Sequence, residues 1–178
     1  MLPVQPVDKG ASMRFGASRS FLGLAAVMVV LAACSGAEVA EKVIESQEGV
    51  GDIEIEENDG TVALEFEDEE GTVSGVFGGG EIPADFPVPV PDGGTVTAVL
   101  TQAGNTSVAL SYAQSEFESL KSFYADYVEG KTVLLEAASA DPPAATWIVE
   151  VEGGSINITV ADSGSTTEVV IAVVSDTG

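Results

Sequence analysis

Alternating apolar and charged residues over residues 51–77 predict a small antiparallel β-meander. Within 53–56 and 62–67, an Ile, Val, Leu or Phe stands at every second position, mostly with Glu between. An Asn-Asp-Gly turn separates these two runs, and a third short strand is expected to end at Phe77. This period of two buries one face of the sheet and leaves an acidic face in water.

Residues 95–178 predict a mainly antiparallel α+β domain. Two alternating apolar runs joined by Ala-Gly-Asn are typical of a hairpin. A helix is expected to begin at Ser115, to form a capping box with Glu118 and to end at Gly130. Its apolar stripe contains Phe117, Leu120, Tyr124, Tyr127 and Val128. Four more strands follow, so the predicted order is ββαββββ, with one helix on the sheet.

Four prolines within residues 81–94 exclude a helix or a central strand there. The segment is predicted to be an extended strap, and the alternative is a polyproline ligand for an aromatic groove. The predicted organisation is a signal peptide (1–33), a lipidated N-terminus (34–36), an acidic helix plus β-meander (37–77), a Gly/Pro-rich linker (78–94) and the α+β domain (95–178).

The N-terminal region has the layout of a secretory signal peptide. Residues 1–20 contain three basic residues and one acid, and residues 21–33 contain no charged residue. This apolar run is shorter than the roughly 20 residues that a transmembrane helix needs. The basic flank and the apolar run fit most closely if translation starts at Met13.

The sequence Leu31-Ala32-Ala33-Cys34 resembles the lipobox of bacterial lipoproteins. The resemblance implies that the Cys34 sulfur receives a diacylglyceryl group and that the chain is cut just before this cysteine. A thiolate is the nucleophile that this transfer needs. Cys34 is the only cysteine, and lipidation would account for an unpaired thiol in an exported chain. The alternative is an ordinary signal peptide followed by a stray cysteine.

The mature chain from Cys34 onward is strongly acidic. Of 29 acidic residues only Asp8 precedes it, and of six basic residues Lys42, Lys121 and Lys131 remain, so the formal net charge is about −25. Such a surface repels phosphate backbones, which excludes nucleic acids as partners. The expected partners are the membrane, through the lipid anchor, and another envelope protein or a basic ligand.

Motifs beyond the lipobox are similar to those of cell-envelope lipoproteins, especially those of actinobacteria. These motifs are structural and imply no activity. The matching positions are Ile82-Pro83, Phe86-Pro87, Pro91, Gly93 and Phe123-Tyr124. The resemblance implies a protein anchored to the cell membrane or outer membrane, with its domain on the extracytoplasmic side.

Candidate catalytic chemistry is sparse. The chain has no histidine, no G-x-S-x-G motif and no phosphate-binding loop, so we expect no enzyme and no cofactor. The alternatives are an envelope hydrolase that uses acids alone and a calcium-binding surface module on the acidic meander face. The carboxylates of that face are Glu54, Glu56, Glu65 and Glu67. We favour the interpretation that they form a solvated acidic face without a metal site.

Overall fold

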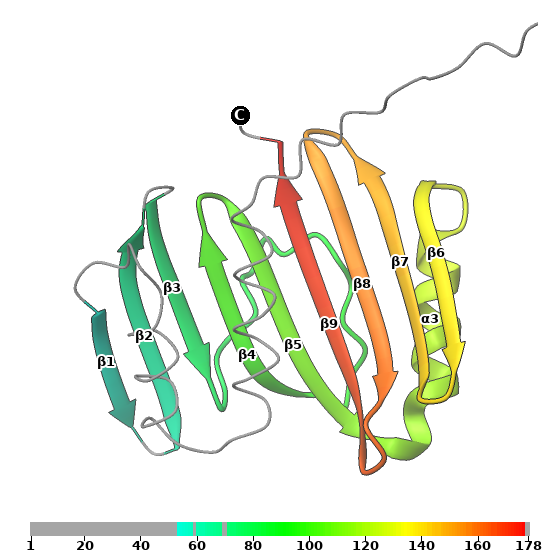
Figure 1. Cartoon of the computed structure of the whole chain (residues 1–178), viewed down its shortest axis with the longest axis horizontal. Helices are drawn as coiled ribbons and strands as arrows, with labels where there is room; N and C mark the ends of the chain where they lie inside the picture. The colour runs from blue at the N-terminus through cyan, green and yellow to red at the C-terminus, as the bar shows by residue number, and fades with distance from the viewer. Residues whose placement is uncertain (1–52, 59, 69–70, 177–178) are drawn as a thin grey trace, which may run out of the picture. The chain divides into compact units, whose positions relative to one another are not determined.

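Nine strands form one antiparallel sheet with the spatial order β1-β2-β3-β4-β5-β9-β8-β7-β6 (Figure 1). The computed structural model describes residues 53–58, 60–68 and 71–176. The strands are β1 (Ile53–Asn58), β2 (Thr61–Asp68), β3 (Gly71–Phe77), β4 (Thr95–Gln102), β5 (Asn105–Ala113), β6 (Thr132–Ala140), β7 (Pro143–Val151), β8 (Gly154–Asp162) and β9 (Thr166–Ser175). A 3₁₀ turn, η1 (Gln114–Glu116), and a helix, α3 (Phe117–Val128), follow β5. The predicted α+β class with a mainly antiparallel sheet is therefore confirmed.

The predicted meander is present as β1, β2 and β3. Gly60 in the β1–β2 turn has a φ of 83°, a left-handed conformation that glycine adopts without strain. β3 then pairs with β4 from Val73 opposite Gln102 to Phe77 opposite Ala98. The meander and the strands after residue 95 therefore belong to one continuous sheet. The helix expected within 37–47 lies outside the described residues.

The helix begins differently from its prediction. Ser115 lies inside η1, the N-cap of α3 is Glu116, and no side chain caps either element. The predicted capping box between Ser115 and Glu118 is thus wrong. The 3₁₀ turn sets the helix start two residues later, and the Ser119 hydroxyl donates to the Glu116 carbonyl oxygen at 2.8 Å. The predicted stop at Gly130 is confirmed, since this residue has a left-handed φ of 77° just after the helix.

The helix packs on the sheet through its predicted stripe. Leu120, Tyr124 and Val128 are buried, and Phe117 and Tyr127 pack partly against the same core. The core that they join contains side chains of β5, β7, β8 and β9, including Val108, Leu110, Trp147, Val149, Ile156, Ile158, Val169 and Ile171. The burial of these apolar side chains is the main favourable contribution to the stability of this part of the sheet.

The proline-rich segment 81–94, the strap, contains neither helix nor strand and has turns at 84–85 and 92–93. It joins the same core. Val88 is buried in it, and Ile82, Phe86 and Val90 pack against it. The hydroxyl of Tyr112 donates a hydrogen bond to the Pro91 carbonyl oxygen at 2.9 Å. The strap and α3 therefore cover the same face of this part of the sheet. The predicted absence of helix and strand in 81–94 is confirmed, whereas turns interrupt the predicted extended conformation.

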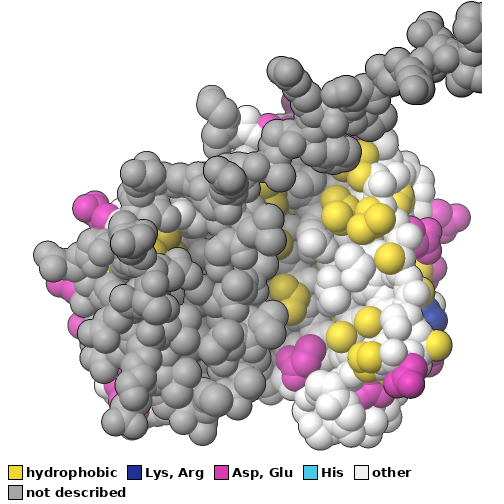
Figure 2. Space-filling view, in the orientation of Figure 1, with side chains coloured by type: hydrophobic (Ala, Val, Ile, Leu, Met, Phe, Trp, Pro, Cys, Tyr) yellow, Lys and Arg dark blue, Asp and Glu magenta, His cyan; other side chains and the backbone are white. Residues whose placement is uncertain are grey.

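The apolar side of the sheet changes between its two halves. The register pairs Val99 with Val108, so these residues share the face that α3 and the strap cover. Leu64, Val73 and Leu100 are buried on the opposite face. A register shift in β4 between Val96 and Ala98 accompanies this exchange. On the face of β9, β8 and β7 that is turned toward the viewer, the visible side chains are mostly uncharged, with carboxylates near the margins (Figure 2).

Two buried tyrosines lead to a stability prediction. The Tyr124 hydroxyl is buried and has no hydrogen-bond partner among the described residues, whereas the Tyr112 hydroxyl is bonded to Pro91. Tyr124→Phe should therefore leave stability near neutral pH almost unchanged, while Tyr112→Phe should cost about 1 kcal/mol. Urea unfolding of both variants measures this difference. A larger loss for Tyr124→Phe than for Tyr112→Phe would contradict it.

The same pair predicts a loss of stability at alkaline pH. Burial raises the pKa of Tyr124 above the ordinary 10.0, and it also raises the pKa of Tyr112, with a smaller contribution from Asp92. Folded-state values above the unfolded value favour the protonated phenol in the folded state. This contribution is complete below pH 10 and is lost as the pH rises further. The urea concentration at the unfolding midpoint should decrease as the pH rises beyond 10. This decrease should be smaller in Tyr124→Phe protein.

Candidate functional site: an acidic groove on strands β1 to β4

The predicted acidic face of the meander is built by β1 and β2. Glu54 lies directly opposite Glu65, and Glu56 lies opposite Ala63. These three glutamates are exposed, and so is Glu67, which pairs with Thr72 near the end of β2. The sheet register thus brings Glu54 and Glu65 together, as the hairpin pattern predicts, and leaves Glu67 farther along the same face.

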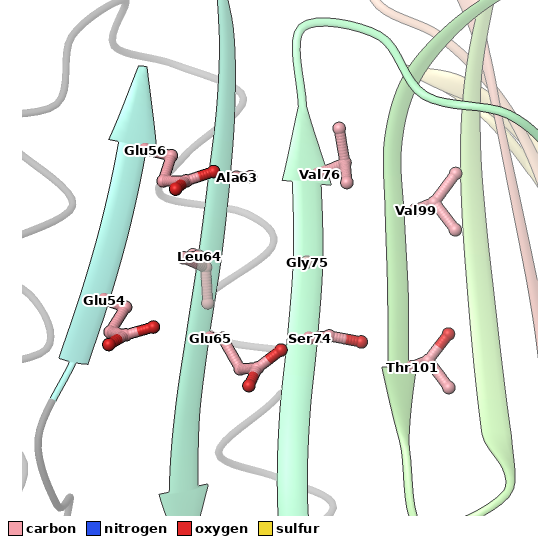
Figure 3. Close-up of a pocket in the computed structure, with 10 residues that line it drawn as sticks. All are labelled: Glu54, Glu56, Ala63, Leu64, Glu65, Ser74, Gly75, Val76, Val99 and Thr101. Atoms are coloured by element: carbon pink, nitrogen blue, oxygen red, sulfur yellow. The ribbon is translucent and has the colours of Figure 1, made fainter. Parts of the chain in front are cut away.

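The carboxylates border an open groove with a volume of about 360 Å³. Its residues are Glu54, Glu56, Ala63, Leu64, Glu65, Ser74, Gly75, Val76, Val99 and Thr101. The register aligns eight of them in two rows across four strands, with Leu64 and Gly75 between the rows (Figure 3). The polar row runs from Glu54 through Glu65 and Ser74 to Thr101. The other row begins at Glu56 and continues through small or branched apolar side chains.

Two features of the groove were missed by sequence reasoning. The hydroxyls of Ser74 and Thr101 complete the polar row, and Val76 and Val99 line the apolar row. These side chains come from β3 and β4, which are separated in sequence by the strap. No sequence pattern indicated that β3 pairs with β4, so the groove could not be drawn beyond the first hairpin.

Among the described residues, no ion pair neutralises the glutamates of the groove. The ion pair present in this part of the chain joins Lys121 and Glu118 on α3 at 3.5 Å, away from the groove. Facing glutamates such as Glu54 and Glu65 destabilise a strand pair by roughly 0.2–1 kcal/mol. Over the described residues, no three Asp, Glu, His or Cys side chains gather into a set that could hold a metal ion. The arrangement suits diffuse attraction of cations.

Three comparisons with known proteins give no relative for this chain. No family model, no curated protein and no solved structure matches it. The predicted lipid-attachment residue, Cys34, lies outside the described residues. Within the described ranges, no helix combines the length and the apolar character that crossing a membrane would require.

Cations are expected to stabilise the protein by screening. Self-repulsion of the acidic chain should weaken as salt rises, because the Debye length falls from about 30 Å at 0.01 M to about 10 Å at 0.1 M. Melting curves in NaCl and CaCl₂ at matched ionic strength should therefore coincide. Stabilisation that saturates at micromolar calcium, unmatched by sodium, would contradict screening and indicate a specific site.

A double variant tests whether the charge repulsion that lowers stability arises in the groove. Glu54→Gln with Glu65→Gln removes the facing carboxylates, so it should stabilise the protein by roughly 0.2–1 kcal/mol at low salt. The matched control, Glu81→Gln with Glu152→Gln, changes the net charge equally at two exposed positions outside the groove. Equal effects of the two pairs would show that net charge alone is responsible.

Proposed function

We propose that this chain is a lipid-anchored protein of a bacterial cell envelope that acts as a non-catalytic binding or spacer module on the extracytoplasmic side. The observation that carries the proposal is the sequence Leu31-Ala32-Ala33-Cys34 at the end of the apolar run 21–33. Two or more acyl chains at Cys34 would hold the protein stably on a membrane, which a single chain does not. The predicted ββαββββ unit from residue 95 would form most of the body that this anchor carries.

The groove supports a binding role for that body. Its glutamates are exposed, and the mature chain has a net charge of about −25, so cationic partners are attracted over long range. We propose a basic ligand or a basic surface of another envelope protein as the partner. An acid-only hydrolase, the alternative, would need a carboxyl group in an enclosed site shielded from water, whereas Glu54, Glu56 and Glu65 are exposed.

Replacement of the cysteine tests the anchor. The unaltered chain should enter the detergent phase on phase separation, and its N-terminal peptide should have a mass increased by acyl groups on Cys34. Cys34→Ser removes the nucleophile, so this protein should lack the added mass and leave the membrane fraction. Ser35→Ala, the neighbouring control, should behave like the unaltered chain. Membrane-bound Cys34→Ser protein would refute the proposal.

A further inference from the structure

Strand β6 is an open edge of the nine-stranded sheet. It pairs with β7 on one side, and no described strand pairs with its other side (Figure 1). All nine of its residues are exposed. Val133, Leu134 and Leu135 are large hydrophobic side chains with 40, 59 and 46 % of their surface accessible. Glu136 is the one charged residue of the strand, in a chain that is otherwise rich in carboxylates.

The opposite edge of the sheet has a different chemistry. β1 carries exposed Glu54, Glu56 and Glu57 within six residues. Proteins protect sheet edges from pairing with other chains by placing charges, prolines or bulges on them. β6 contains one irregularity, a register shift at Leu134, and it pairs regularly with β7 from Leu135 to Ala140. The sheet therefore has one edge lined with carboxylates and one edge whose backbone from Leu135 onward and whose apolar side chains remain available to another strand.

We propose that β6 pairs antiparallel with β6 of a second copy of this chain, around a twofold axis. An edge strand offers main-chain donors and acceptors in both directions, so it is complementary to itself. Around an axis at Leu135, the apolar residues 133–135 would face residues 135–137 of the partner. A basic partner would find Glu136 as the only carboxylate on this strand, so charge does not favour such a ligand here.

The acidic edge determines how this assembly closes. Pairing of β6 with β1 of another copy would lie head to tail and continue into an open filament. It would also bring residues 133–135 against a strand that carries three exposed glutamates, whose desolvation is costly. Pairing of β6 with β6 leaves the two acidic edges at the outer ends of a closed dimer.

The size of the contact indicates a weak dimer in free solution. Nine residues of a strand span about 30 Å, and a single pair of edge strands lies at the low end of the areas buried in specific interfaces. Copies anchored to one membrane would meet at a higher effective concentration, which favours pairing. This last step rests on the proposed function, whereas the pairing itself does not.

The single charge on β6 sets the expected register. An axis at Glu136 would place two carboxylates directly opposite each other, which is unfavourable. An axis at Leu135 places leucine opposite leucine and Glu136 opposite the apolar Leu134 of the partner. Leu135 should therefore lie next to Leu135 of the second copy.

Cysteine crosslinking of the full chain in detergent tests the pairing. Leu135→Cys should form disulfide-linked dimers under mild oxidation, because facing residues of paired strands lie within disulfide reach. Glu54→Cys on the acidic edge and Ser165→Cys in the β8–β9 turn are the controls. Dimer yields from Leu135→Cys no higher than from these controls would overturn the proposal.

The same experiment separates this proposal from the proposed function. Lipidated Cys34 cannot crosslink, so the unaltered chain should give no disulfide dimer. Disulfide dimers of the unaltered chain would count against lipidation, and the comparison would then be repeated with Cys34→Ser in every variant. The yield at Leu135→Cys relative to the controls still decides the pairing.

A charge placed on the edge gives a second test. Leu134→Glu should lower the crosslinking of Leu135→Cys on the order of tenfold, because it places a second carboxylate opposite Glu136 of the partner, twice in a symmetric dimer. Ser165→Glu makes the same change of net charge in the turn and should leave the yield unaltered. Equal yields from the two glutamate variants, with unchanged unfolding midpoints, would overturn the proposal.

Discussion

Leu120→Ala is expected to lower the free energy of unfolding by about 2–5 kcal/mol. Leu120 is 3 % exposed on the face of α3 that packs against the sheet at β7 and β8. Its truncation removes buried apolar surface and leaves a cavity that the surrounding strands cannot close completely. Because a domain of this size is stable by only about 5–15 kcal/mol, the loss should be visible as a large shift in the urea midpoint.

Phe123→Ala is the matched control for this experiment. Phe123 lies one turn farther along α3, and 37 % of its surface is exposed. The replacement removes a larger side chain from the same helix, but from a position that packs less. It should cost clearly less than Leu120→Ala. The opposite order would mean that α3 does not lie on the sheet through the face described above.

Gly154→Ala is expected to cost up to about 3 kcal/mol, since it introduces an atom where two strands touch. Gly154 is buried at the start of β8 and pairs with Ser175 of β9. A Cβ atom there would overlap the backbone carbonyl of Val174, which cannot rotate away as a side chain can. The end of β9 must therefore move away from β8 or lose pairing.

The control for this second prediction is Gly79→Ala. Its added Cβ would have the Thr61 Oγ1 atom as its nearest neighbour, at 3.3 Å, and a hydroxyl-bearing side chain can adjust. Chemical unfolding of both variants measures the difference. Similar midpoints for the two would show that β8 and β9 do not approach as closely at Gly154 as the sheet register requires.

The second prediction concerns the strand that joins the two halves of the sheet. β9 lies between β5 and β8, so its last residues connect the helix-covered half of the sheet to the half that carries the groove. A loss of pairing at the end of β9 should reach the groove only through β5 and β4. The Glu54→Gln, Glu65→Gln double variant is therefore expected to have the same stabilising effect at low salt in Gly154→Ala protein that remains folded.

The local pattern of the chain was sufficient for several features. Alternation in 53–56 and 62–67 identified the strands of the meander, because a period of two puts successive side chains on opposite faces. The helical stripe around Leu120 and Tyr124 and the stop at Gly130 were predicted for similar local reasons. The facing of Glu54 and Glu65 followed from a short hairpin, in which the turn sets the register.

Other features depended on contacts between distant segments. Alternation tells which residues of a strand share a face, but it does not tell on which side of a sheet that face lies. Only the pairing of β3 with β4 places Leu64 and Val108 on opposite sides, and only this pairing extends the acidic row to Ser74 and Thr101. The open edge at β6 was likewise invisible in the sequence. A strand becomes an edge through the order of its neighbours, which long-range packing decides.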